Sequence, residues 1–280
     1  MSIIFYLLFL FFVLGTLMGS FLNCVIYRLK KGKSFISGRS FCPKCKHNLE
    51  WYDLIPIFSF IALRGKCRYC KKRISLQYPL VEVATGIIFV LIFWHLGFGF
   101  DLIFGLLILD FIYLLTVCCL LIIIFVYDLR YYIIPDKIIY LAIFIVFFYH
   151  LFRILNFGHW NLFGIWDLGF GIWKPLLEPL ITGIGAGAFF FLLWFVSSGR
   201  WLGFGDVKLT FLMGFFLGFP NIIAALFSTY LIGAIIGIGL IVFKKKSLKS
   251  KIPFGPFLVL GTFIVLFWGE RIINWYLNFL

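Results

Sequence analysis

The chain has 280 residues, of which 63% are hydrophobic and 13% charged, and its formal net charge is +14. A typical soluble domain carries about 25% charged residues, so this composition excludes a soluble globular domain, a disordered chain and a secreted disulfide scaffold. A polytopic membrane protein remains. Basic residues of membrane proteins collect in cytoplasmic loops and near anionic lipid, so we expect a lipid bilayer and no nucleic acid as partner.

The apolar stretches predict about eight transmembrane helices, because one span requires about 20 mostly apolar residues. Residues 209–243 carry no formal charge and are too long for one pass, so the turn sequence Gly218-Phe-Pro-Asn221 divides them into a short and a full helix. The fold class is therefore an all-α polytopic membrane protein with a small polar insert between helices 1 and 2. The other expected spans are residues 1–27, 83–100, 102–127, 138–152, 179–199 and 252–269.

The distribution of basic residues predicts the sidedness of these spans. Residues 28–73 contain 13 Lys and Arg, and most of the others fall in alternate connections, ending with the lysine cluster at 244–251. Because cytoplasmic loops are enriched in Lys and Arg, we expect these loops in the cytosol and both termini outside. The segment 156–174, rich in Trp and Gly, then lies on the outer face as an interfacial aromatic belt, and its role is otherwise not predicted.

Four cysteines of the insert form two CxxC pairs, Cys42 with Cys45 and Cys67 with Cys70, and 21 residues separate the pairs. This spacing is typical of a four-thiolate zinc ribbon. Four sulfur ligands leave no coordination position for a substrate, so the zinc is expected to be structural and to fold a loop too small for a core of its own. The alternatives are two disulfides, which the reducing cytosol disfavours, and replacement of one cysteine ligand by His47.

Two aspartates are expected at one depth, near the cytosolic ends of two helices. Asp128 lies at the end of the third span, and Asp206 lies in Gly203-Phe-Gly-Asp206 at the start of the short sixth helix. The apolar run of that helix before the Gly218 turn gives only about 15 Å at 1.5 Å per residue, so the helix must recruit residues back to about Trp201. Gly203 and Gly205 allow another segment to approach closely.

Two neighbouring carboxyl groups cannot both ionise easily, and such a pair can hydrolyse a peptide bond. The ionised member activates water while the protonated member polarises the scissile carbonyl. No HExxH or GxSxG motif is present. The alternative is that Asp128 pairs with Arg130, and Asp206 with Lys208, as ordinary interface charges.

Two other classes of function remain open at this point. The first is an ion-coupled membrane transporter that uses intramembrane carboxylates, with Asp110 as its mid-span charge. The second is a zinc-ribbon scaffold that recruits secretion partners and in which the aspartates are dispensable.

Several motifs, taken together and in order, resemble those of the prepilin peptidases, or type IV leader peptidases, which are membrane aspartyl proteases of the GxGD kind. The last helices fit that family in hydropathy only, and Lys30-Lys31 stands where the family usually has a proline. The matching segments are GSFLNCVIYR at 19–28, RSFCPKC at 39–45, LRGKCRYC at 63–70, ISLQYPLVE at 74–82, DLR with IPD within 128–136, and GFGDVKL at 203–209.

The resemblance implies that Asp128 and Asp206 are the catalytic pair and that Gly203, Gly205 and Asp136 support them. Its substrates are prepilins and pseudopilins, which lose a short basic leader after a glycine at the cytosolic face of the bacterial inner membrane. Members with the cysteine insert often also N-methylate the new terminus with S-adenosylmethionine. Nothing in these residues demonstrates that second activity, and neither a methyl-donor site nor an oligomeric state is predicted.

The expected organisation follows from these assignments. Residues 1–280 form a single membrane domain. Within it, residues 28–77 form the cytosolic zinc-binding insert and residues 78–280 form the catalytic transmembrane bundle.

Overall fold

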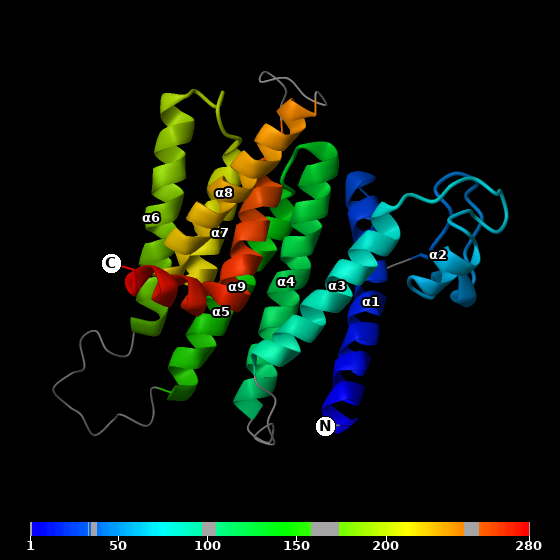
Figure 1. The fold of residues 1–280 in the computed structure, drawn as a ribbon, viewed down its shortest axis with the longest axis horizontal. Helices are drawn as coiled ribbons and strands as arrows, with labels where there is room; N and C mark the ends of the chain where they lie inside the picture. Colours follow the sequence, from blue (N-terminus) through cyan, green and yellow to red (C-terminus); the bar gives the residue numbers. More distant parts are fainter. Residues whose placement is uncertain are drawn as a thin grey trace. The chain divides into compact units, whose positions relative to one another are not determined.

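A computed structural model describes residues 2–32, 34, 38–96, 105–157, 174–243 and 252–279 (Figure 1). It confirms an all-helical chain, and seven of the helices described are long and apolar enough to cross a membrane. The protein is thus a multi-pass membrane protein. The long helices are α1 (Ser2–Lys30), α3 (Gln77–His95), α4 (Gly105–Tyr131), α5 (Asp136–Phe157), α6 (Lys174–Val196), α8 (Asn221–Val242) and α9 (Gly255–Leu277).

The expected division of residues 209–243 is confirmed. Helix α7 (Phe204–Leu217) has 14 residues, or about 21 Å, and is shorter than the seven long helices. It ends at Gly218, whose positive φ of 67° suits a residue without a side chain, and α8 begins at Asn221. Because α7 starts at Phe204, the GFGD sequence forms its cap and first turn.

The chain divides into two compact units, Met1–Ile123 and Ile124–Leu280. In the first, α1 packs on α3 along a stripe of small residues, and the two helices cross (Figure 1). A Cβ added at Gly15 would lie 2.7 Å from Cα of Gly86, and one at Gly19 would lie 2.7 Å from Cα of Glu82. Only glycine at these positions allows so close a crossing.

Polar contacts join the same two helices to each other and to the insert, which contains a 3-10 helix, η1 (Trp51–Leu54), and a short helix, α2 (Phe58–Ala62). The amide of Asn23 donates to the carbonyl of Tyr78 at 3.1 Å, and buried Arg28 donates to the carbonyl of Gly38 at 2.7 Å. Helix α3 begins before the expected start of its span, so Glu82 lies inside the helix and is buried.

The second unit is built on two close helix pairs, α6 with α7 and α8 with α9. A Cβ at Gly214 of α7 would lie 2.8 Å from Cα of Gly183 in α6, and one at Gly261 of α9 would lie 2.5 Å from the carbonyl oxygen of Ala225 in α8. Helix α7 also contacts α5 and α9, so it occupies the interior of this bundle (Figure 1). Buried Leu209, Leu212, Met213 and Phe215 on α7 are consistent with that position.

Some of the expected features fall outside the described residues. These are most of the tryptophan-rich segment 156–174, the lysine cluster at 244–251, and parts of the basic connection that leads into the insert.

Candidate active site and cysteine cluster

Asp128 lies in the last turn of α4 and is 4% exposed. That turn closes when the N–H of Tyr132 donates to the carbonyl of Asp128 at 2.8 Å, and the helix ends there because Tyr132 has a positive φ of 59°. The Asp128 carboxyl group faces the start of α9, where the backbone N–H of Gly255 donates to it. The side chain is therefore held by an element distant in sequence.

Asp206 is the third residue of α7 and is 8% exposed. Its Oδ2 accepts a hydrogen bond from the N–H of Gly203 at 3.0 Å, so the carboxyl group folds back over the first turn of its own helix. The unpaired N–H groups and the positive end of the helix dipole favour a carboxylate at this position. The GFGD sequence thus orients its aspartate locally.

Ile134 joins the two aspartate segments. A Cβ at Gly205 would lie 3.0 Å from Cβ of Ile134, and a Cβ at Gly255 would lie 3.2 Å from Cδ1 of the same residue. The carboxyl groups of Asp128 and Asp206 are close enough to interact electrostatically. The C-terminus of α4, the N-terminus of α7 and the N-terminus of α9 therefore meet at one buried acidic site.

Asp136, the first residue of α5, forms an ion pair with Lys208, with Nζ 2.7 Å from Oδ1. Lys208 is two residues beyond Asp206 on α7, so the pair joins the starts of α5 and α7 beside the acidic site. The alternative in which Lys208 pairs with Asp206 is wrong, because Lys208 points to Asp136 instead. The reason is geometric: residues two apart on a helix do not share a face.

Asp110 is not at mid-span, contrary to the expectation on which the transporter alternative rested. It is the sixth residue of α4 (Gly105–Tyr131), close to the start of that helix. At that depth a carboxyl group reaches the headgroup region, so it is not the isolated mid-membrane charge that ion coupling requires.

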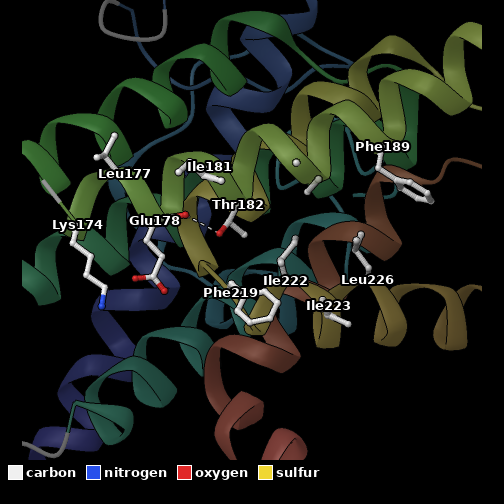
Figure 2. A pocket seen from close by; sticks show the side chains of 12 residues that line it. Lys174, Leu177, Glu178, Ile181, Thr182, Phe189, Phe219, Ile222, Ile223 and Leu226 are labelled. Atoms are coloured by element: carbon white, nitrogen blue, oxygen red, sulfur yellow. Dashed lines mark hydrogen bonds between the residues drawn. The ribbon is translucent and has the colours of Figure 1, made fainter. Parts of the chain in front are cut away.

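Two features of the structure were not predicted from the sequence. The backbone of Gly255 contacts Asp128, and the only sequence signal is its position in Pro253-Phe-Gly-Pro256, a pattern typical of a turn before a helix. A groove of about 780 Å³ also runs between α6 and α8, with Lys174 and Glu178 at one end and Phe219 and Ile222 on its wall (Figure 2). Neither aspartate of the acidic site lines this groove, so we assign it no part in the chemistry.

The four cysteines of the insert converge on one point. Their Sγ atoms all lie within 4.8 Å of one another, and all four are free thiols, so the disulfide alternative is wrong in this structure. His47 is not part of the group, and its ring lies against that of Tyr69 at an interplanar angle of 36° with 3.7 Å between centroids. Four converging thiols at this separation are a set that can hold one metal ion in a tetrahedral site.

The two CxxC segments adopt the same turn, and the second repeats the first. In each, the first cysteine donates its N–H to the carbonyl five residues later, at 2.9 Å for both Cys42 and Cys67. Its own carbonyl accepts from the residue four positions later, Lys46 in one turn and Lys71 in the other, and both lysines have a positive φ near 60°. Each turn thereby aims its two sulfur atoms in one direction.

Ionisation within the cysteine cluster is uneven. Burial opposes a thiolate at Cys42, but hydrogen bonds from the backbone of Cys45 and Lys44 outweigh it and lower the pKa of Cys42 to about 7. At Cys45 a backbone hydrogen bond from His47 favours the thiolate, yet burial and the neighbouring thiols prevail and raise the pKa to about 11. One thiolate therefore opposes the next, and a bound divalent cation removes that repulsion.

Comparison with known proteins adds two family matches. Residues 13–96 match the bacterial peptidase A24 N-terminal domain, and residues 114–238 match the type IV leader peptidase family. The first range contains all four cysteines, and the second contains both aspartates of the acidic site.

Curated relatives match along almost the whole chain. Proteins named prepilin leader peptidase/N-methyltransferase are 31% identical in Xanthomonas campestris pv. campestris, covering 95% of this chain and 93% of the relative, and 31% identical in Aeromonas hydrophila, covering 97% and 94%. A protein of the same name from Legionella pneumophila is 29% identical, covering 97% and 96%. No solved structure matches the chain.

Proposed function

Because this chain belongs to the type IV leader peptidase family, we propose that it is a membrane-embedded aspartyl endopeptidase that removes the leader of prepilins and pseudopilins. The observation that carries the proposal is the convergence of Asp128 and Asp206, two buried carboxyl groups from separate helices whose surrounding segments both pack on Ile134. The relatives named above do not support the transporter alternative.

The chemistry assigned to the pair needs one proton between the two carboxyl groups. The ionised carboxylate takes a proton from a water molecule as that water attacks the scissile carbonyl, and the protonated carboxyl donates to the carbonyl oxygen. When the resulting tetrahedral intermediate collapses, a proton passes to the leaving amine. The two carboxyls exchange roles during the cycle, so neither residue is assigned one fixed role.

Neighbouring groups hold this pair in position. The N–H of Gly203 orients Asp206, the N–H of Gly255 orients Asp128, and the ion pair of Asp136 with Lys208 fixes α5 against α7. We assign Gly203, Gly205 and Asp136 a supporting role, because none of the contacts described requires them to touch the reacting atoms.

Separate Asp128→Asn and Asp206→Asn variants test the proposal. Each is nearly isosteric and removes the proton exchange, so leader removal from a purified prepilin should fall by at least about 100-fold. Asp110→Asn is the matched control, because it removes a carboxyl group near the opposite end of α4 and should cleave at the wild-type rate. Wild-type cleavage by both folded dyad variants would contradict the proposal.

For the cysteine cluster we propose one structural zinc ion held by Cys42, Cys45, Cys67 and Cys70. The support is the convergence of four free thiols in two matching turns. Metal analysis should find about one zinc per chain in the wild type and much less in Cys42→Ser. The absence of zinc from freshly purified, reduced wild type would contradict this assignment.

N-methylation of the new terminus is proposed from the relatives alone, since their names include N-methyltransferase. We assign no residue to the S-adenosylmethionine site. Incubating the enzyme and a prepilin with and without the methyl donor should yield a mature pilin one methylene unit heavier only when the donor is present.

The proposed location is the bacterial inner membrane, with the acidic site facing the cytosol and both termini outside. The support is the excess of Lys and Arg in alternate connections. Reporter fusions to each terminus and within the insert measure this directly, and cytosolic termini would overturn the orientation.

A further inference from the structure

The segment between the two cysteine turns exposes large apolar side chains. Trp51 is 75% exposed, Phe58 is 68% exposed and Ile61 is 66% exposed, and Leu54 and Ile55 lie between them. We call these five residues the apolar ridge. On a domain surrounded by water, an exposed group of this size would be costly and marks an interaction surface.

Within each of the two short helices, the ridge residues lie on one face. Trp51 and Leu54 are three apart on the 3-10 helix η1, and Phe58 and Ile61 are three apart on α2, a spacing that places both members of each pair on one face. Elements η1 and α2 contact each other. Phe60, on another face of α2, is half-buried, and its ring lies 3.1 Å from where a Cβ of Gly65 would stand.

A partly buried hydrogen bond fixes the depth of the ridge. The N–H of Ile57 donates to Oε2 of Glu82 at 2.8 Å, and Glu82 is only 6% exposed. Ile57 has a positive φ of 60°, a conformation that a β-branched residue adopts only when surrounding contacts impose it. The hydrogen bond therefore holds the ridge, and this part of the insert, against α3.

The position of Glu82 relates this depth to the membrane. Glu82 is the sixth residue of α3, which is a candidate span, so it lies about 7.5 Å along the helix from Gln77. The headgroup region on each side of a bilayer is about 5–8 Å thick. Because Ile57 is the N-cap of α2, its hydrogen bond to Glu82 places the start of α2 beside the second turn of α3 and not beyond the helix end.

The insert that carries the ridge has a net charge complementary to an anionic surface. Residues 28–73 contain 13 Lys and Arg but only two acidic residues, Glu50 and Asp53. Asp53 already pairs with Arg68 at 2.8 Å, so little negative charge faces outward. The exposed basic residues of the insert include Lys44, Lys46, Arg64, Lys66, Lys71, Lys72 and Arg73.

We propose that the apolar ridge inserts into the headgroup region of an anionic lipid leaflet, so that the cysteine insert lies on the membrane surface. Apolar side chains then occupy the acyl boundary while the surrounding Lys and Arg contact lipid phosphates, as in amphipathic surface anchors. The inference rests on the membrane spans and on the contacts of the insert. It does not depend on the peptidase activity.

Site-specific photocrosslinking in the full-length protein tests this inference. Benzoylphenylalanine replaces Phe58 in one variant and Phe60 in a matched control, and both proteins are reconstituted into nanodiscs of phosphatidylglycerol and phosphatidylcholine. Because only position 58 faces lipid, its yield of lipid adduct should exceed that of position 60 at least about fivefold. Discs of phosphatidylcholine alone should lower the yield at position 58 at least about twofold.

Four outcomes would overturn the inference. Equal lipid adduct at positions 58 and 60 would mean that α2 has no lipid-facing side. Adducts at position 58 to a second copy of the chain, or only to an added prepilin, would assign the ridge to a protein partner. An unchanged yield in phosphatidylcholine would refute the anionic surface. A Glu82→Leu variant provides a further readout. Because it loses the hydrogen bond to Ile57, the difference in lipid-adduct yield between positions 58 and 60 should become smaller.

Discussion

Gly255 illustrates how a single backbone position can control a reactive group. Its N–H donates to Asp128, and a Cβ at this residue would lie 2.5 Å from Oδ2 of the same aspartate. A real Cβ does not approach an oxygen so closely, so any side chain at residue 255 must displace the carboxyl group or α9. The position requires glycine for contact rather than for an unusual backbone angle.

We therefore expect Gly255→Ala to slow leader removal about 10- to 100-fold, while overpacking lowers the free energy of unfolding by about 1–3 kcal/mol. Initial cleavage rates and thermal unfolding of the purified variant measure the two effects. Gly237→Ala is the control, since nothing lies within 4 Å of a Cβ there. Unaltered cleavage by Gly255→Ala would show that this contact does not position Asp128.

Glu82 is a second residue whose single hydrogen bond is expected to have a large structural effect. Replacing it with Ala leaves the partly buried N–H of Ile57 without its acceptor, which should cost about 1–3 kcal/mol and release the strained turn between η1 and α2. Amide hydrogen exchange of residues 51–62 should become faster in Glu82→Ala. Glu82→Gln keeps an acceptor oxygen and should exchange nearly as slowly as the wild type; equally slow exchange in both variants would contradict the role assigned to this bond.

At the scale of the elements, α5 and α7 are joined at their N-termini by Asp136 and Lys208. The side chain of Asp136 is 60% exposed, so the free energy of the pair is small, about 0.2–1 kcal/mol. Its effect on the reaction is expected to act through the position of α7, whose first turn carries Asp206. The pair is a positioning contact and not a source of stability.

This positioning role predicts that Asp136→Ala and Lys208→Ala each lower kcat several-fold and leave KM nearly unchanged. The double variant should be no slower than the slower single variant, because both remove the same contact. The exchanged pair, Asp136→Lys with Lys208→Asp, should recover part of the lost rate. Additive losses and no recovery would mean that the two residues act independently.

At the scale of the whole molecule, the membrane spans and the insert depend on different forces. Each span forms its backbone hydrogen bonds internally, as lipid requires, and needs no ligand. The insert has little interior, since Cys42 and Cys67 are among its few buried side chains. Its structure should therefore depend on the metal proposed for the four thiols.

Chelation of the metal tests this difference. Removing zinc should expose residues 38–76 to proteolysis while the helical circular dichroism of the spans remains nearly unchanged. Cys118→Ser, which alters a buried cysteine of α4 outside the cluster, should not sensitise the insert. Proteolysis that is unchanged by chelation would mean that the insert folds without metal.

Hydropathy predicted the all-helical class and the long spans, and the turn sequence at Gly218–Asn221 predicted the division there. These features are local because a helix in lipid satisfies its own backbone, so about 20 apolar residues suffice to identify it. The CxxC spacing likewise predicted the cluster of four cysteines, because each CxxC turn is closed by backbone hydrogen bonds between residues close in sequence. The roles of Asp128 and Asp206 came from motif resemblance, and they stay proposals until the variants are assayed.

The pairing of residues across helices was decided only by the tertiary structure. Lys208 pairs with Asp136 rather than with nearby Asp206, Gly255 contacts Asp128, and Ile57 is held by Glu82. Each of these contacts joins residues far apart in the chain, and no periodicity encodes them. They depend on how closely helices approach, which small side chains such as Gly15 and Gly214 set through packing. The sequence by itself thus determined which segments cross the membrane and which residue types could react, and packing determined which of those residues meet.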